Sequence, residues 1–288
     1  MKYSVKEILY YVFNRLPKTI IGKYFKHNLV YAHWGRGLNN FGDCLTPFIL
    51  KYYGLTPVYV PSFHKSDIIL AGSILQLIPR DYKGTIIGTG GSNIVYNFPN
   101  ASIKAVRGIL TLNNIINNNH DKIRLGDPGL LMSYIYHNDV SKNTLIGIIP
   151  HFVDKDDPAI TTIHNRNKKS TTIINVLDSP SKVIKKIKSC KYILSSSLHG
   201  LIIADTFHIP NIRFTTKRNN ANYKYDDYYS SLGIESTYIQ LKGDESLQEL
   251  ISLTSLKPVD KIQSLKEDLN QIMISYALSV KNNLRSIF

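Results

Sequence analysis

The 288-residue chain is long enough for one large domain or two modest ones. Hydrophobic residues make up 43% of it and charged residues 19%, which excludes an intrinsically disordered protein. Lys and Arg total 35 against 21 Asp and Glu, a formal net charge of +14. We therefore expect anionic partners: a phosphorylated substrate, nucleic acid or an acidic membrane surface. A solvated basic surface with no specific role is the alternative.

Two cysteines, Cys44 and Cys190, lie far apart in the sequence and match no metal-ligand spacing. We expect no disulfide framework and no metal requirement, and the reducing cytoplasm is the predicted compartment. No apolar stretch reaches the ~20 residues that a membrane-spanning helix needs. The first apolar cluster also lacks the features of a secretory signal.

The first predicted element is an amphipathic helix over residues 5–16, which Pro17 ends. Basic residues dominate the chain up to residue 28, where Glu7 is the single acid. Such a helix can dock on anionic lipid. Packing on the domain with a solvated basic face is an equally good interpretation.

Short apolar runs then alternate with helical patterns, which is typical of a parallel sheet with crossover helices. The predicted strands form two series, 29–32, 67–70, 84–88 and 104–106, followed by 145–150, 172–176, 192–195 and 211–214. A polar stretch, 137–143, separates the two series. We expect two α/β domains that face a cleft, residues 1–138 and 139–288, with a long helix from Pro258 onward in the second.

The segment from Ser195 to Ala204 carries the clearest chemical pattern. An apolar strand leads into three serines, a histidine and a glycine, and a helix begins there. Exposed amides and hydroxyls at a helix N-terminus form an anion site. A histidine beside a bound anion is well placed to donate a proton, so His199 is a candidate general acid. A histidine that only caps or packs is the alternative.

Ser-Ser-Leu-His-Gly over residues 196–200, followed by Ile-Ile-Ala-Asp-Thr-Phe-His-Ile-Pro-Asn, resembles the signature of the polysaccharide pyruvyl transferase family. Other segments match it in order: Asn-Phe-Gly-Asp at 40–43, Val-Arg-Gly at 106–108, Gly-Asp-Pro at 126–128 and Ile-Pro-His at 149–151. The Lys-Tyr-Asp-Asp-Tyr-Tyr segment at 224–229 resembles relatives that pyruvylate exopolysaccharides. Together these motifs cover most of residues 29–235.

The resemblance implies two Rossmann-like domains arranged as in the GT-B glycosyltransferases. It also implies a transferase that moves the pyruvyl group of phosphoenolpyruvate to a sugar of a capsule or exopolysaccharide, or of its lipid-linked precursor. The product would be a cyclic ketal, and phosphate would be released. Phosphoenolpyruvate is then the donor substrate and no cofactor is expected. The implied location is the cytoplasm, with peripheral attachment to the inner face of the membrane.

The resemblance assigns His199 as the acid that protonates the enol methylene, and Arg107 as the cation that binds phosphate or carboxylate. An interdomain or surface salt bridge is the alternative for Arg107. Asp43 would accept a proton from the acceptor sugar or orient it, unless it only caps a helix. Further substrate-binding residues are expected at Asn40, His151, Ser196, Ser197, Leu198, Gly200, Arg213 and Lys217.

Some of these assignments have competing interpretations. His151 fits a donor pocket or a structural hydrogen bond equally well, whereas Asp127 fits a turn before Pro128 better than chemistry. Ser197 stands where many relatives have arginine, and Arg213, Lys217 or Arg218 would have to supply the missing charge. Tyrosines between residues 223 and 229 suit sugar binding or a packed cap.

Two other functions fit parts of the pattern. A nucleotide-sugar glycosyltransferase of the same architecture would use a similar anion site, although no acidic residue is placed to hold a ribose. A nucleic-acid binder would account for the net charge, but it should gather its basic residues in one stripe, and here they are scattered. We therefore expect no nucleic-acid partner.

Overall fold

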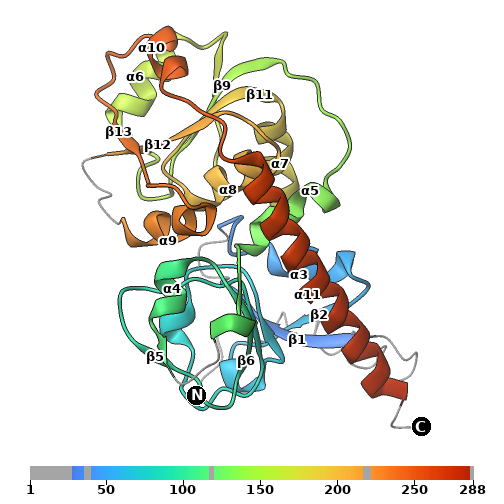
Figure 1. The fold of residues 1–288 in the computed structure, drawn as a ribbon. Coiled ribbons are helices and arrows are strands. Elements are labelled where there is room, and N and C mark those ends of the chain that lie inside the picture. The colour runs from blue at the N-terminus through green and yellow to red at the C-terminus, as the bar shows by residue number, and fades with distance from the viewer. Residues whose placement is uncertain (1–27, 36–39, 117–119, 217–221, 286–288) are drawn as a thin grey trace.

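The protein is described by a computed structural model that covers residues 28–35, 40–116, 120–216 and 222–285 (Figure 1). The predicted amphipathic helix over 5–16 lies outside the described residues, as do Lys217 and Arg218. Within the described ranges no helix unites the length and the apolar character needed to cross a bilayer.

A parallel six-stranded sheet forms the first half of the molecule, in the order β2-β1-β3-β4-β6-β8. Its strands are β1 (Leu29–His33), β2 (Thr56–Tyr59), β3 (Ile68–Ile69), β4 (Thr85–Ile87), β6 (Ser102–Val106) and β8 (Arg124–Leu125). The shorter strands β5 (Tyr96–Asn97) and β7 (Ile115–Ile116) pair separately. The accompanying helices are α3 (Thr46–Tyr52), α4 (Ile109–Asn113) and α5 (Met132–Ile135).

The second half contains a parallel five-stranded sheet in the order β10-β9-β11-β12-β13. Its strands are β9 (Thr144–Ile149), β10 (Thr171–Ile173), β11 (Cys190–Ser195), β12 (Asn211–Thr215) and β13 (Tyr238–Gln240). Its helices are α6 (Pro158–Arg166), α7 (Pro180–Lys188), α8 (Leu198–Thr206), α9 (Tyr223–Leu232) and α10 (Leu247–Ser252). The predicted α/β fold with two parallel sheets is confirmed. The domain boundary at residue 138 stays a prediction.

Helix α8 lies at the centre of the molecule. All of its residues are buried, because it packs against β11 and β12 of its own sheet and also against α7, α11 and η5 (Pro128–Leu131), a 3₁₀ turn that follows the first sheet. Such complete enclosure explains why its sequence is largely apolar, with His199, Asp205 and Thr206 as the polar exceptions. The start of α8 is therefore held rigidly between the two sheets.

The long C-terminal helix, α11 (Val259–Arg285), joins the two halves (Figure 1). It packs on α8, on β8 and on η5, and the Tyr53 hydroxyl of the first half donates a 2.7 Å hydrogen bond to Asn270 Oδ1. One hydrophobic cluster runs through β1, α8 and α11. The predicted helix is confirmed, but it packs on both halves and not on the second alone.

Candidate functional site

Polar residues gather where the two sheets meet end to end. On the first sheet, β1, β3 and β6 end before the loops that carry Asp43, Ser73 and Arg107. On the second sheet, β9 and β11 end before His151 and His199. Ligands of open α/β sheets bind outside the carboxyl ends of the strands, so this junction is the candidate site.

His199 stands in the first turn of α8 and is 6% exposed. Its ring packs on Gly42, where a Cβ atom would lie 2.0 Å from His199 Nδ1. The neighbouring amide of Phe41 donates to the Val176 carbonyl at 2.9 Å, which ties this loop of the first half to the second half. Glycine at position 42 is thus required for the two halves to meet at His199.

Asp127 faces the same imidazole. Its Oδ1 atom accepts a 2.8 Å hydrogen bond from the Gly129 amide and caps η5, which confirms the predicted turn. The same oxygen lies 3.8 Å from His199 Nε2. Among the described residues, neither His199 Nε2 nor Asp127 Oδ2 has a hydrogen-bond partner, and both atoms are buried. The sequence analysis did not predict that Asp127 also lies beside His199, although the Gly-Asp-Pro motif drew attention to this residue.

Asp43 does not cap a helix. The N-cap position of α3 is Leu45, no side chain caps that helix, and the interpretation of Asp43 as an N-cap is wrong. Its carboxylate makes no hydrogen bond within the described ranges. Burial raises the pKa of Asp43, and the negative charge of Asp127 adds to this rise. The positive charges of His199 and Lys224 act in the opposite direction. Asp43 therefore belongs to the same charged cluster as His199.

The side chain of Asn40, by contrast, shapes the loop that carries Asp43. Its Oδ1 atom accepts from the Gly42 amide at 3.2 Å, and its carbonyl accepts from the Cys44 amide at 3.2 Å. Asn40 is buried and serves the structure of this loop. Its predicted contact with substrate stays a prediction.

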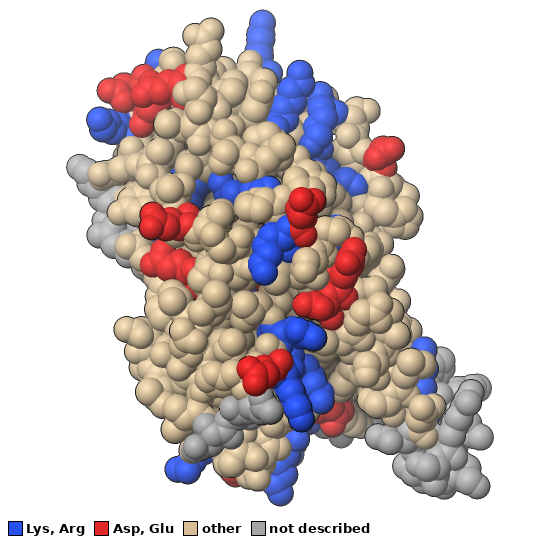
Figure 2. All heavy atoms as spheres, viewed as in Figure 1, with Lys and Arg blue, Asp and Glu red and all other residues tan. Residues whose placement is uncertain are grey.

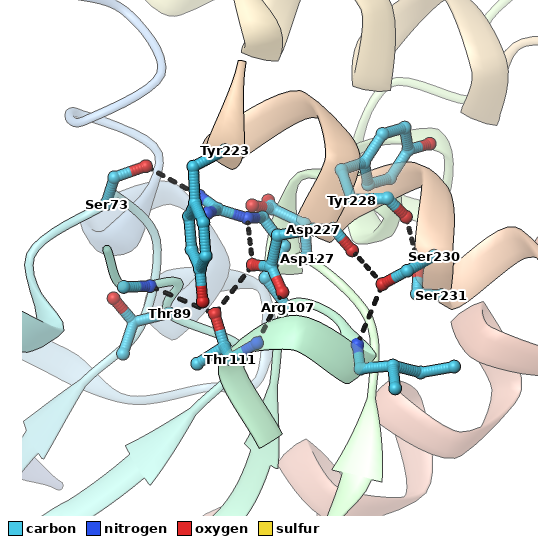
Figure 3. A network of polar contacts seen from close by, with 12 residues as sticks. Ser73, Thr89, Arg107, Thr111, Asp127, Tyr223, Asp227, Tyr228, Ser230 and Ser231 are labelled. Atoms are coloured by element: carbon cyan, nitrogen blue, oxygen red, sulfur yellow. Dashed lines mark hydrogen bonds and ion pairs between the residues drawn. The ribbon is translucent and has the colours of Figure 1, made fainter. Parts of the chain in front are cut away.

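Arg107 forms a buried salt bridge between the two halves (Figure 3). Its Nε atom donates to Asp227 Oδ2 of α9 at 2.8 Å, and its Nη1 atom donates to Ser73 Oγ at 2.5 Å. Asp227 also accepts from the amide and the hydroxyl of Thr111, both at 2.7 Å. Arg107 Nη2 is buried and has no hydrogen-bond partner in the part of the chain that the structure describes. The salt bridge considered as the alternative for Arg107 is present and joins the two halves, and Nη2 is the part of the guanidinium that this network does not use.

His151 lies beside a second buried carboxylate. Its amide donates to Ser196 Oγ at 2.9 Å, and this hydroxyl donates to Asp154 Oδ2 at 2.6 Å. Burial, together with the charges of Lys224 and His199 and against the opposing charge of Asp154, lowers the pKa of the His151 ring to about 4. The ring is thus neutral near pH 7, and its Nδ1 atom has no hydrogen-bond partner among the residues described. Neither Asp154 nor its partner Thr216 stood out in the sequence, because no motif surrounds them.

The segment that precedes His199 builds the start of α8. The Ser197 amide donates to Ser195 Oγ at 3.0 Å, whereas the Ser197 hydroxyl makes no hydrogen bond within the described ranges. Leu198 belongs to the hydrophobic core, and a Cβ at Gly200 would come 2.5 Å from Ser195 Oγ. The predicted contacts of Leu198 and Gly200 with substrate would therefore use their backbone amides.

Arg213 and Lys224 add two cations from the second half. Arg213 is buried on β12, donates to Asn222 Oδ1 at 2.8 Å, and stacks over the Tyr225 ring with its Cζ atom 3.7 Å from the centroid. Lys224 lies in the first turn of α9 and is partly buried. Burial and the charges of Arg107 and Arg213 lower the pKa of Lys224 to about 8. Lys224 was not singled out from the sequence, although it opens the Lys-Tyr-Asp-Asp motif.

Three of the clustered tyrosines are packed residues. Tyr225, Tyr228 and Tyr229 lie in the hydrophobic core. The Tyr225 hydroxyl donates to the Ser196 carbonyl at 2.6 Å, and the Tyr228 hydroxyl donates to Asp205 Oδ2 at 2.9 Å. These contacts favour a packed cap over a sugar-binding surface.

Two further features bear on what the site can do. Among the described residues, no group of at least three His, Cys, Asp or Glu side chains is arranged to hold a metal ion, and the expectation of metal-free chemistry stays a prediction. A cavity of about 1010 Å³ lies elsewhere, at the amino ends of the strands of the first sheet. Its lining includes Leu29, Thr85 and Ser102 together with Tyr276 of α11. We place the site by its chemical groups because none of the predicted residues lines that cavity.

A comparison with known families assigns the chain. The model of the polysaccharide pyruvyl transferase family matches residues 5–218. The protein belongs to this family. The motifs that resembled it in the sequence all fall within or directly after the matched region.

Individual relatives are more distant. The chain is 24% identical over 212 residues to the succinoglycan biosynthesis protein ExoV of Rhizobium meliloti (strain 1021), covering 70% of this chain and 64% of that protein. It is 31% identical over 175 residues to the uncharacterized protein L143 of Acanthamoeba polyphaga mimivirus, covering 57% and 60%. The chain thus spans less than two thirds of the length of either relative.

Among solved structures, the wall teichoic acid polymerase TagF aligns over 99% of both chains with 8% identity and a TM-score of 0.47. This score is too low to support an argument about fold or function.

Proposed function

We propose that this protein transfers the pyruvyl group of phosphoenolpyruvate to a sugar of a surface polysaccharide or of its lipid-linked precursor, with closure of a cyclic ketal and release of phosphate. Family membership supports pyruvyl transfer in general. The observation that carries the proposal is the pair His199 and Asp127: His199 Nε2 lies 3.8 Å from Asp127 Oδ1, and within the described ranges His199 Nε2 and Asp127 Oδ2 are buried without a hydrogen-bond partner. Buried polar atoms are rarely left unpaired unless a ligand or water satisfies them.

In the proposed first step, His199 donates a proton to the methylene carbon of phosphoenolpyruvate. The methylene becomes a methyl group, and the neighbouring carbon becomes electrophilic. Asp127, held by its bond to the Gly129 amide, orients the imidazole and balances its charge. Arg107 Nη2 offers a hydrogen-bond donor to the anionic groups of the substrate.

A sugar hydroxyl then attacks the electrophilic carbon, and Asp43 accepts its proton. A second hydroxyl of the same sugar displaces phosphate and closes the ketal ring. Two hydroxyl protons are lost overall; one balances the proton that the methyl group gained, and the other leaves with phosphate. The raised pKa of Asp43 suits a group that must take up a proton during the reaction.

The choice of acceptor and location rests on the sequence. A lipid-linked sugar would present its anionic carrier at the cytoplasmic face of the membrane, where the basic N-terminal segment can bind. Over the face of the molecule in Figure 2, basic side chains are spread across both halves among acidic ones. A nucleic-acid binder is expected to carry a basic stripe, and this face shows none.

The test is acceptor-dependent phosphate release from phosphoenolpyruvate, with free and lipid-linked sugars, by the wild type and by His199→Gln. We expect release by the wild type and a loss of roughly 10²- to 10⁴-fold in the variant, because a general acid contributes about that much. The product should carry a new methyl resonance and be labile to acid. Calorimetry with phosphoenolpyruvate alone provides a reading that needs no acceptor. No binding of phosphoenolpyruvate, together with hydrolysis of a nucleotide sugar, would contradict the proposal.

A further inference from the structure

Lys224 is a cation that the reaction described above does not use. It lies in the first turn of α9, and the next residue, Tyr225, places this turn beside the start of α8 through its 2.6 Å hydrogen bond to the Ser196 carbonyl. The charged or titratable groups that act on Lys224 come from both halves of the molecule: Asp43, Arg107, His151, Asp154 and Arg213.

The ammonium group of Lys224 lies 5.1 Å from the centroid of the Tyr225 ring, and within the described ranges it makes no hydrogen bond or ion pair. Other sheltered lysines of the chain do bond to protein groups: Lys257 Nζ donates to Ser255 Oγ at 3.0 Å, and Lys142 Nζ donates to the Cys190 carbonyl at 2.8 Å. Desolvating a charge without pairing it is costly. Lys224 therefore has donors to offer to a ligand.

Positive charge accumulates around this ammonium group. Arg107 uses Nε and Nη1 within the protein and has a buried, unpartnered Nη2, and Arg213 is the third cation. Burial and the two arginines lower the pKa of Lys224 to about 8, although Asp43 and Asp154 act in the opposite direction. A multiply charged anion between these side chains would remove the repulsion.

We propose that Lys224 binds the phosphate group of the donor, together with the first-turn amides of α8 and the Ser197 hydroxyl. This inference rests on the proposed function, since it names the donor as phosphoenolpyruvate. Phosphate fits better than carboxylate because it carries the larger charge and because a helix N-terminus is an established type of phosphate site. The carboxylate is then left to Arg107.

Titration calorimetry with phosphoenolpyruvate and, separately, with inorganic phosphate tests the inference. The variants are Lys224→Gln, which removes the charge, and Lys224→Arg, which keeps it. Lys191→Gln is the matched control, because Lys191 is exposed at the opposite end of β11. Removing one of several like charges relieves repulsion, so Lys224→Gln should fold, and thermal unfolding verifies this.

We expect Lys224→Gln to weaken both ligands roughly 10- to 100-fold, since a hydrogen bond to a charged group is lost. The affinity of Lys224→Arg for both ligands should stay within about threefold of that of the wild type. The affinity of Lys191→Gln should equal that of the wild type. Unchanged affinity of Lys224→Gln for phosphoenolpyruvate would overturn the inference and leave the proposed function intact. A loss for phosphoenolpyruvate but none for phosphate would overturn the assignment to the phosphate group. A wild type that binds no phosphoenolpyruvate would overturn the proposed function itself.

The pH dependence gives a second reading. The pKa of Lys224 is about 8, so the wild type should lose affinity for phosphoenolpyruvate as the pH rises above that value. An arginine stays charged throughout this range. Lys224→Arg should therefore keep its affinity up to pH 9, and a parallel decline in both proteins would count against the role of Lys224.

Discussion

Two polar clusters lie between the sheets, and they differ in how their groups are satisfied. The Asp227 network comprises Ser73, Arg107, Thr111, Asp227 and Ser230 (Figure 3). Both oxygens of Asp227 accept hydrogen bonds, and the Ser230 hydroxyl accepts from the Ile109 amide at 2.9 Å. The His199 cluster comprises Asp43, Asp127, His151, His199 and Lys224. Imidazole and carboxylate atoms of this cluster are buried without partners.

This difference separates structural from chemical tasks. A fully paired buried network holds two parts of a protein in one arrangement, whereas unpaired buried groups cost stability and are kept where a ligand will satisfy them. Arg107 belongs to both, because its Nε and Nη1 atoms join the network and its Nη2 atom does not. Arg107 therefore connects the salt bridge that joins the two halves with the candidate site.

The largest expected effect on stability comes from breaking the network. Asp227→Asn leaves the Arg107 guanidinium buried without its counter-charge, and we expect the free energy of unfolding to fall by about 3–5 kcal/mol. Denaturant unfolding measures this loss. The matched control is Asp226→Asn, one residue earlier and partly exposed, which should change stability by less than about 0.5 kcal/mol. Equal effects of the two substitutions would show that the network does not hold the halves together.

In the His199 cluster, we expect the substitution Asp43→Asn to raise the free energy of unfolding, by less than Asp227→Asn lowers it. The folded-state pKa of Asp43 is raised, so the folded protein disfavours its carboxylate, and stability is lost as the pH rises from the unfolded-state pKa of ~3.9 through the folded value. Asp43→Asn removes this cost. We expect it to stabilise the protein by on the order of 1 kcal/mol at pH 7, while phosphate release falls. The gain should vanish near pH 3, and a gain independent of pH would show that the carboxylate is not its source.

Much of the fold could be predicted because parallel strands are buried on both faces and read as apolar runs. β1, β9, β11 and β12 were all expected near their observed positions. The edge strand β2 was missed because Pro57 interrupts its pattern, and an edge is where a sheet tolerates proline. Two-residue strands such as β8 are too short to show any periodicity.

The site was predictable only where a motif marked it. His199 stood out through the strand–serine–histidine–glycine pattern, Asp43 and Arg107 through the family resemblance, and the structure brings all three to one junction. Lys224 was missed because its significance depends on charges from distant parts of the chain, which only the fold assembles. The pairing of Arg107 with Asp227 joins positions 120 residues apart and leaves no local pattern in the sequence.

The most direct test of the difference between the clusters is to measure unfolding and phosphate release for Asp127→Asn beside Asp227→Asn. Asparagine caps a helix as well as aspartate does, so Asp127→Asn should keep the Gly129 bond and lie within about 0.5 kcal/mol of the wild type in stability. Its phosphate release should fall at least about tenfold, because the imidazole of His199 loses the charge that orients it. Wild-type turnover by Asp127→Asn, with a loss of stability equal to that of Asp227→Asn, would contradict the account.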